Sequence, residues 1–253
     1  MTRTVLVTGG ARRIGRVIAL DLARHGWRVA VHHHLSAEDA EAVAAEIEGA
    51  GGTAAVVSAD LAREDDTAGL VERAAEAVGP LTALINNASV FERDDAMDAT
   101  RASWDLHMEV NLRAPFVLTQ GFARQLPDGA GGSVVNILDQ RVWNLTPFFT
   151  SYTVSKAGLW TLTQTLALAL APRIRVNAVG PGPTLPSQRQ TEESFRKQWS
   201  AQPLSRQVRP EEVAAAVRFI LDAPSVTGQM IAVDAGQHLC WSPAQSRAGA
   251  ADE

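Results

Sequence analysis

The sequence is poor in cysteine, in positive charge and in long apolar runs. Its single cysteine, Cys240, cannot form a disulfide within the chain, and nothing requires an oxidising compartment. Lys and Arg number 23 against 28 Asp and Glu, and the net charge of −5 favours neither a nucleic-acid nor an anionic-membrane partner. The longest apolar stretch, residues 159–171, is interrupted by polar side chains and is too short to span a bilayer. The first predicted strand begins at Thr4, which leaves no room for a signal peptide, so we expect a cytoplasmic protein.

Apolar, strand-like runs alternate with segments of helical periodicity along nearly the whole chain. With 46% hydrophobic and 20% charged residues, 253 residues can build one large α/β domain. The predicted strands cover residues 4–10, 27–34, 53–60, 81–89, 132–139, 173–182 and 228–236. The predicted helices cover residues 16–26, 67–79, 103–126, 150–171 and 210–221, with another between Ser36, its predicted N-cap, and Gly49. This alternation predicts an α/β fold, a Rossmann-type doubly wound parallel sheet of about seven strands with helices on both faces.

Two segments depart from this alternation. Residues 184–209 are polar and contain Pro186 and Pro203, and long irregular segments inside compact domains often serve as lids. Residues 242–253 are small and polar, which is typical of a flexible tail. No repeat or linker interrupts the rest, so we expect a single domain over residues 1–241.

A glycine-rich turn follows the first predicted strand and opens the first helix. Gly9 and Gly15 allow a ligand to approach the backbone closely, and the start of the helix offers free N–H groups to a pyrophosphate. Arg13 stands where many turns of this kind have a middle glycine. An ordinary βα turn is the alternative, but the strand–turn–helix context favours a dinucleotide site.

The end of the second strand bears on the choice between the two nicotinamide cofactors. An acidic residue there binds the ribose 2′-hydroxyl and repels a 2′-phosphate. Residues 32–36 are HHHLS, and the first carboxylate after the start of this strand is Glu38. Arg12 and Arg13 add positive charge beside the same pocket, so the sequence predicts NADPH/NADP+ as the cofactor.

The histidines of this strand have two other interpretations. Alternate strand residues share a face, so they could form a metal site, but no third ligand is evident and we predict no metal. A structural role for at least one of them is the second. Asp60, after the third strand, is placed to bind an adenine amino group, or it is simply the polar end of a strand.

Tyr152 and Lys156 lie four residues apart on one face of a predicted helix. A lysine ammonium next to a phenol stabilises the phenolate and lowers the pKa of the phenol. Chance matches to this spacing are common, but here it accompanies the glycine-rich turn, Asn86-Asn87-Ala88, Asn111 and Pro181-Gly182. With these motifs the chain resembles the short-chain dehydrogenase/reductase family over roughly residues 3–240.

The resemblance implies a role for each matching residue. Tyr152 would be the proton donor, Lys156 would bind the nicotinamide ribose and lower the tyrosine pKa, and Asn111 would hold a water in a proton relay. The expected cofactor contacts are Gly9, Arg12, Arg13, Ile14, Gly15, His33, His34, Ser36, Asp60, Leu61, Asn87, Ala88, Ser89, Tyr152, Lys156, Pro181 and Gly182.

Asp139 lies thirteen residues before the tyrosine, where the family usually has a serine that binds a substrate carbonyl. A carboxylate repels a developing alkoxide, whereas it suits a substrate with N–H donors or a nitrogen that must be protonated. Reduction of a C=N bond in a pterin fits this requirement. Alternatively, Asp139 caps a loop or forms an ion pair with Arg141.

The same pattern is similar to one branch of the family, the pteridine reductases and dihydromonapterin reductases. In that branch Phe91 would stack on the pterin opposite the nicotinamide, Ser89 would contact it, and Arg13 would reach cofactor or substrate. Leu35 stands where the branch commonly has an arginine. Phe91 could instead be an ordinary apolar residue at the sheet edge. The resemblance thus implies the catalytic set Asp139, Tyr152, Lys156 and Asn111, and the substrate contacts Arg13, Ser89, Phe91, Asp139 and Tyr152.

We therefore predict an NADPH-dependent reductase that converts a dihydropterin, such as dihydromonapterin or dihydrobiopterin, to a tetrahydropterin, with dihydrofolate as a further candidate substrate. The alternatives are a carbonyl reductase acting on a 3-oxoacyl or other ketone substrate, and a non-catalytic NADP(H)-binding regulator. The helix over residues 150–171 is apolar on faces away from the Tyr–Lys pair, which predicts a subunit contact. The resemblance implies a homotetramer.

Overall fold

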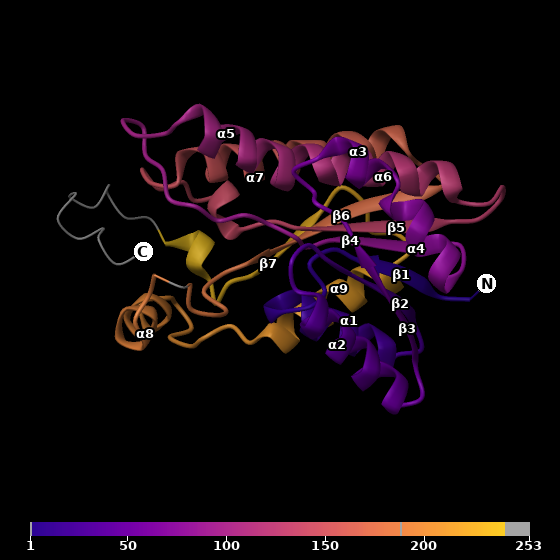
Figure 1. Ribbon diagram of the computed structural model, residues 1–253. Coiled ribbons are helices and arrows are strands. Elements are labelled where there is room, and N and C mark those ends of the chain that lie inside the picture. The colour runs from indigo at the N-terminus through magenta and orange to yellow at the C-terminus, as the bar shows by residue number, and fades with distance from the viewer. Residues whose placement is uncertain (1, 188, 241–253) are drawn as a thin grey trace.

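A parallel β-sheet forms the centre of the computed structural model, which describes residues 2–187 and 189–240 (Figure 1). Over these residues the sheet has seven strands in the order β3-β2-β1-β4-β5-β6-β7, and all neighbours run parallel. The strands are β1 (Thr4–Val7), β2 (Arg28–His33), β3 (Thr53–Ser58), β4 (Ala83–Asn86), β5 (Gly132–Ile137), β6 (Ile174–Pro181) and β7 (Met230–Val233). Every residue of β1 and β4 is buried, as expected for strands covered on both faces. The predicted α/β fold is confirmed.

Helices cover the two faces of the sheet, and an apolar cluster fills the space under each group (Figure 1). One face carries α1 (Arg13–Arg24), α2 (Ala37–Gly49) and α9 (Pro210–Asp222). The other face carries α4 (Leu70–Val78), α6 (Ala114–Gln125) and α7 (Thr150–Ala169). The remaining elements are α3 (Glu64–Ala68), α5 (Arg101–Met108), α8 (Glu192–Ser200), the π-helical segment η1 (Glu109–Arg113) and the short 3-10 turns η2 (Gln140–Val142) and η3 (Gln237–Leu239).

Three helical segments differ from the sequence-based expectation. The helix predicted over residues 103–126 consists of α5, η1 and α6, because a π-helical turn interrupts it without breaking the apolar periodicity. The helix predicted over residues 67–79 is two helices, α3 and α4, that meet at Gly69. The predicted lid contains α8, whose N-cap Thr191 accepts the Ser194 amide with its side chain and which buries Phe195. The predicted tail, residues 242–253, lies outside the described residues.

The carboxyl ends of the central strands meet at one edge of the sheet. β1 leads into the glycine-rich turn at Gly9, β4 leads to Asn87, and β5 ends two residues before Asp139. Because β2 and β4 lie on opposite sides of β1, the strand order reverses there, and open α/β sheets bind ligands at such a point. Among the described residues, no helix is both long and apolar enough to cross a membrane.

Candidate active site

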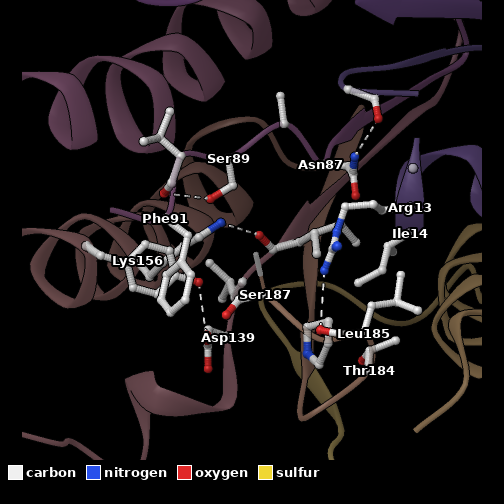
Figure 2. A pocket seen from close by; sticks show the side chains of 18 of the residues that line it. Arg13, Ile14, Asn87, Ser89, Phe91, Asp139, Lys156, Thr184, Leu185 and Ser187 are labelled. Carbon is white, nitrogen blue, oxygen red and sulfur yellow. Dashed lines mark hydrogen bonds between the residues drawn. The ribbon is translucent and has the colours of Figure 1, made fainter. Parts of the chain in front are cut away.

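A cavity of about 720 Å³ opens at this edge of the sheet, between the strand ends and the segment that carries α8. Seventeen predicted site residues line it: Gly9, Arg12, Arg13, Ile14, Gly15, His34, Asp60, Leu61, Asn87, Ala88, Ser89, Phe91, Asp139, Tyr152, Lys156, Pro181 and Gly182. Figure 2 shows Phe91, Lys156 and Asp139 on one side of it and Arg13, Ile14 and Leu185 on the other. Of the described residues, three predicted ones are missing from the lining: His33, Ser36 and Asn111.

The glycine-rich turn requires glycine at Gly9 because of its backbone conformation and at Gly15 because of lack of space. Gly9 has a φ of +61°, and a Cβ on Gly15 would lie 2.1 Å from the Gly9 carbonyl oxygen. Arg13 has a φ of 52°, in the left-handed region that glycine adopts most easily, which accounts for the glycine of similar turns. The residue before α1, Arg12, caps it with no side-chain hydrogen bond to a described residue, so backbone N–H groups at the start of α1 are free to bind an anion.

The side chain of His32 contacts this turn, although His32 was not among the predicted site residues. Its Nδ1 accepts a hydrogen bond from the Gly9 amide at 3.0 Å, and its Nε2 lies 3.2 Å from the Ala59 carbonyl oxygen. Burial lowers the pKa of His32 to about 4, so the ring is neutral and can both accept and donate. One histidine of the strand therefore has a structural role, as one of the interpretations held.

Strand alternation explains why His34 lines the cavity and His33 does not. Successive side chains point to opposite faces, so His32 and His34 share the cavity side, while the Nδ1 of His33 lies 3.1 Å from the His34 carbonyl oxygen. No group of three or more His, Cys, Asp or Glu in the described part of the chain could hold a metal ion.

Of the residues predicted near a 2′-phosphate, three line the cavity, and His33 and Ser36 do not. Arg12 donates from Nε to Asp39 at 2.6 Å and lines the cavity. Ser36 does occupy the N-cap position of α2, but its side chain makes no capping hydrogen bond to any described residue. Leu35 is 86% exposed. The basic groups placed on the cavity at this end are thus Arg12, Arg13 and His34.

Asp139 and Tyr152 form a hydrogen-bonded pair at the centre of the cavity. The Tyr152 hydroxyl donates to Oδ2 of Asp139 at 2.9 Å. The other carboxylate oxygen accepts the backbone N–H of Arg141 at 2.9 Å, so Asp139 also caps η2. The Arg141 Nε lies 4.0 Å from Oδ2. Loop capping and the contact with Arg141 therefore both occur, but they accompany the bond to Tyr152 rather than replace it.

Lys156 is buried beside Tyr152, and its Nζ donates to the Ile137 carbonyl oxygen at 2.9 Å. Burial lowers the pKa of Lys156 to about 8, against the opposing effect of Asp139. We expected Lys156 to lower the pKa of Tyr152. Instead, burial and then the Asp139 carboxylate raise the pKa of Tyr152 well above its ordinary value, so the phenol is held protonated.

Phe91 belongs to an aromatic wall on the same side of the cavity. Its ring stacks on Phe149 with centroids 4.4 Å apart and meets Tyr152 edge-on at 4.7 Å. The guanidinium groups of Arg141 and Arg189 lie 5.9 Å and 5.7 Å from the centre of the Phe91 ring. Such contacts orient a planar side chain, so the wall presents a flat apolar surface next to the Asp–Tyr pair.

Asn111 lies in η1, behind the cavity lining. Its side-chain amide donates to the Val90 carbonyl at 3.0 Å and to the Ser155 hydroxyl at 3.1 Å, while its oxygen accepts the Val90 amide at 2.8 Å. These bonds join the loop after β4 to α7. The side chain of Asn111 is thereby committed to holding the two walls together.

Arginines fasten the predicted lid to both sides of the cleft. Arg13 donates to the carbonyl oxygens of Leu185 and Pro186, at 3.3 Å and 3.0 Å. On the opposite side, Arg189 donates to the Phe91 carbonyl at 2.7 Å and contacts Glu92. The lid also supplies lining residues that sequence reasoning missed, namely Thr184, Leu185, Ser187, Gln190, Phe195 and Gln198. Gln140 and Arg141 were missed too, although their position directly after Asp139 was a signal for them.

The fold and this site define a short-chain oxidoreductase. A family model described as "Enoyl-(Acyl carrier protein) reductase" matches residues 9–238, and the chain belongs to this family of short-chain dehydrogenases/reductases.

Two crystal structures described as FolM Alternative dihydrofolate reductase 1 are similar to the chain over nearly its whole length. The one from Brucella suis, in complex with NADP, is 51% identical with a TM-score of 0.93, covering 96% of this chain and 98% of that one. The one from Brucella canis, complexed with NADP, is 50% identical with a TM-score of 0.90, covering 95% and 96%. Among curated proteins, the 3-oxoacyl-[acyl-carrier-protein] reductase FabG of Staphylococcus aureus is 33% identical over 244 residues, 94% of this chain and 99% of the relative.

Proposed function

We propose that this protein is an NADPH-dependent reductase of pterins, converting a dihydropterin such as dihydromonapterin or dihydrobiopterin to a tetrahydropterin, with dihydrofolate as a further candidate. The observation that carries the proposal is the 2.9 Å hydrogen bond between the Tyr152 hydroxyl and the Asp139 carboxylate. The similarity to structures described as alternative dihydrofolate reductases, at 50% and 51% identity, supports it.

The carboxylate favours a nitrogen over a ketone oxygen at this position. A ketone becomes an alkoxide during reduction, and its negative charge would meet Asp139 across the cavity. A pterin presents ring N–H and amino donors, which a carboxylate accepts, and its reduced nitrogen gains a proton. The aromatic wall at Phe91 offers a flat ring a stacking surface beside the same pair.

The cavity fits NADPH at the turn and at the second strand. The clash that a Cβ on Gly15 would make, together with the uncapped start of α1, leaves a backbone cradle for a pyrophosphate. Arg12 and His34 would hold a 2′-phosphate, and Asn87, Ala88 and Lys156 would line the nicotinamide end. The cofactor would supply the hydride.

We assign proton delivery to Tyr152 and Asp139. The Tyr152 proton lies between Oη and Oδ2 of Asp139, since the phenol donates to the carboxylate. A substrate nitrogen placed at this pair takes its proton from Tyr152, and the ammonium of Lys156 stabilises the charge left on the phenol. Asn111 keeps the loop after β4 and α7 in register during this step.

A carbonyl reductase is the second candidate function, and the 33% identity to a 3-oxoacyl-[acyl-carrier-protein] reductase favours it. Such an enzyme needs a hydrogen-bond donor over the carbonyl, so Asp139 would have to be protonated. A non-catalytic NADP(H)-binding regulator is the third candidate, and nothing in that role requires Tyr152, Lys156 and Asn111 together.

Three further properties belong to the same proposal. The chain works as one domain whose segment 184–209 covers the cleft, it acts in the cytoplasm, and it assembles as a homotetramer. Exposed apolar side chains on α7, Val154 and Leu168, support a subunit contact on that helix.

A screen of NADPH and NADH oxidation with dihydromonapterin, dihydrobiopterin, dihydrofolate and a 3-oxoacyl thioester tests the function directly. We expect turnover of at least one dihydropterin with NADPH and a faster reaction than with the thioester. Turnover of the ketone alone, improved further by Asp139→Ser, would establish the carbonyl reductase. Unchanged NADPH consumption in a Tyr152→Phe variant would favour the regulator.

A further inference from the structure

A buried polar cluster of Asp94, His107 and Ser151 lies next to Tyr152. Asp94, at 3% exposure, is bonded to the start of α7. Its Oδ1 accepts the Ser151 amide at 3.0 Å, its backbone carbonyl accepts the Thr150 amide at 3.0 Å, and its Oδ2 accepts the Ser151 hydroxyl. Asp94 therefore caps α7 at Ser151, the residue before Tyr152. The N-cap residue itself, Phe149, makes no side-chain capping bond to a described residue.

His107 stands between this cluster and the loop that carries Phe91. It comes from α5, is fully buried, and has different partners at its two nitrogens. Its Nε2 accepts the backbone N–H of Glu92 at 3.1 Å. Its Nδ1 lies 2.9 Å from the Ser103 carbonyl oxygen and 2.7 Å from the Ser151 hydroxyl.

These partners fix the state of the imidazole. An amide N–H can only donate, so Nε2 must be unprotonated, and the proton of the neutral ring lies on Nδ1. The Ser103 carbonyl can only accept, which agrees with a protonated Nδ1. The ring also lies edge-on to Tyr152, with centroids 6.0 Å apart.

We propose that His107 is a positioning residue that sets two walls of the active site against each other. Its Nε2 fixes the backbone next to Phe91, the aromatic wall, and its Nδ1 fixes Ser151, next to the proton donor Tyr152. The first half rests on the proposed pterin function, because Phe91 matters to KM only where a flat ring stacks on it. The second half applies to any substrate that takes its proton from Tyr152.

Two substitutions separate the two links. In His107→Gln the amide reaches the place of Nε2, so the Glu92 contact is kept and the Ser151 contact is lost. In His107→Asn the amide lies near the place of Nδ1, so the Ser151 contact is kept and the Glu92 contact is lost. His25→Asn is the matched control, since that histidine lies on the surface with a 43% exposed side chain.

We expect the kinetic effects to divide between the two variants. His107→Gln should lower kcat about tenfold and leave KM for the dihydropterin within about threefold, because Tyr152 loses its alignment. His107→Asn should raise that KM about tenfold and leave kcat within about threefold, because Phe91 moves. The Kd for NADPH, measured by fluorescence in each variant, should match wild type.

Two readouts need no substrate, so they decide the proposal even where the pterin assignment fails. Amide exchange over residues 150–152 should accelerate only in His107→Gln, because Ser151 loses its contact with Nδ1. Amide exchange over residues 90–95 should accelerate only in His107→Asn, because Glu92 loses its contact with Nε2. Ser151→Ala removes one partner of Nδ1 and should repeat the His107→Gln pattern. It takes the place of His107→Gln if His107→Gln does not fold.

Parallel behaviour of the two variants would overturn the proposal. If both lower kcat and raise KM in the same ratio and accelerate the same amides, the imidazole contributes general stability and no separate alignment. If the two substrate-free readouts divide as expected while no dihydropterin is turned over, the positioning role stands and the pterin function fails.

Discussion

At the scale of single residues, the distinctive feature is a carboxylate bonded to the hydroxyl of the proposed proton donor, Tyr152. Asp139 accepts from Tyr152 and stands close to Arg141, and both Asp139 and burial oppose ionisation of the phenol. The resting pair is therefore a neutral phenol on a carboxylate, a poor arrangement for oxyanion binding and a suitable one for protonating nitrogen.

Removing the carboxylate charge should lower the pKa of Tyr152. Asp139→Asn keeps the size of the side chain and removes its charge, so burial alone is left to raise the pKa of the phenol. The near-ultraviolet absorbance of the phenolate, titrated against pH, reports this single tyrosine. Turnover of a dihydropterin should fall about 100-fold, within the usual range for general acid catalysis.

The control for this titration is Tyr152→Phe, which should show no phenolate signal at all. An Asp139→Asn protein whose tyrosine titrates at the same pH as wild type would show that the carboxylate does not act on the phenol, and the assignment of the acid–base pair would fail with it.

The residues with fixed spacing were the ones that the sequence could identify. Tyr152 and Lys156 lie four residues apart on one helix and so share a face, whereas Asp139 was expected beside them from the resemblance to the family. The direction of the Tyr152 pKa could not be predicted, because it depends on burial and on which partner the hydroxyl chooses. The sequence does not show which of three consecutive histidines faces the turn, so the contact of His32 with the Gly9 amide could not be predicted.

At the scale of elements, His32 couples the glycine-rich turn to pH. Folding holds its pKa near 4, below the ordinary value of 6.5, so between these values the unfolded chain binds a proton that the native one does not. The contribution of His32 to stability is therefore fully present above about pH 6.5 and is lost as the pH drops toward about 4. The loss from this group alone should be roughly 2 kcal/mol between about pH 7 and about pH 5.

Urea unfolding of wild type and His32→Asn at the two pH values measures this loss. The Asn oxygen can still accept the Gly9 amide but does not titrate, so the variant should lose roughly 2 kcal/mol less than wild type over the interval. His107, whose pKa burial also lowers, contributes to both proteins equally and cancels in the comparison. Equal losses in the two proteins would contradict the assignment.

Element boundaries were predictable where turn chemistry marked them. Gly49 ends α2 and Pro210 opens α9, as expected. The π-helical segment η1 was not predictable, because one extra residue in a helical turn leaves the apolar pattern nearly unchanged. The helix α8 was hidden by its polarity, since only Phe195 among its nine residues is buried. Both exceptions place residues at the active site, η1 through Asn111 and α8 through the lid.

At the scale of the whole molecule, the alternation of strand and helix predicted the parallel sheet but not the order of its strands. Parallel strands need right-handed crossovers, which leave few arrangements for seven of them. The cleft, however, depends on a segment that no periodicity describes. Arg13 and Arg189 anchor that segment through backbone carbonyls and Glu92, contacts between residues as far as 173 positions apart.

The exposed apolar side chains of α7 bear on the state of assembly. Leu168 is 84% exposed and Val154 is 43% exposed, both on α7, whose buried face positions Tyr152 and Lys156. Covering such exposed apolar side chains with a second copy of the chain makes the free energy of assembly more favourable. Closed symmetry then favours a defined number of subunits. We expect sedimentation of the wild-type protein to give a tetramer.

Leu168→Asp should reduce the assembled mass, because a carboxylate buried at a subunit contact lacks a partner. Its effect on the fold of one subunit should be small, since the side chain is 84% exposed there. Phe219→Asp on α9, at 57% exposure, is the matched control and should still sediment as a tetramer. A wild-type monomer, or equal loss of mass in both variants, would place the subunit contact elsewhere and leave α7 as a helix that serves the active site alone.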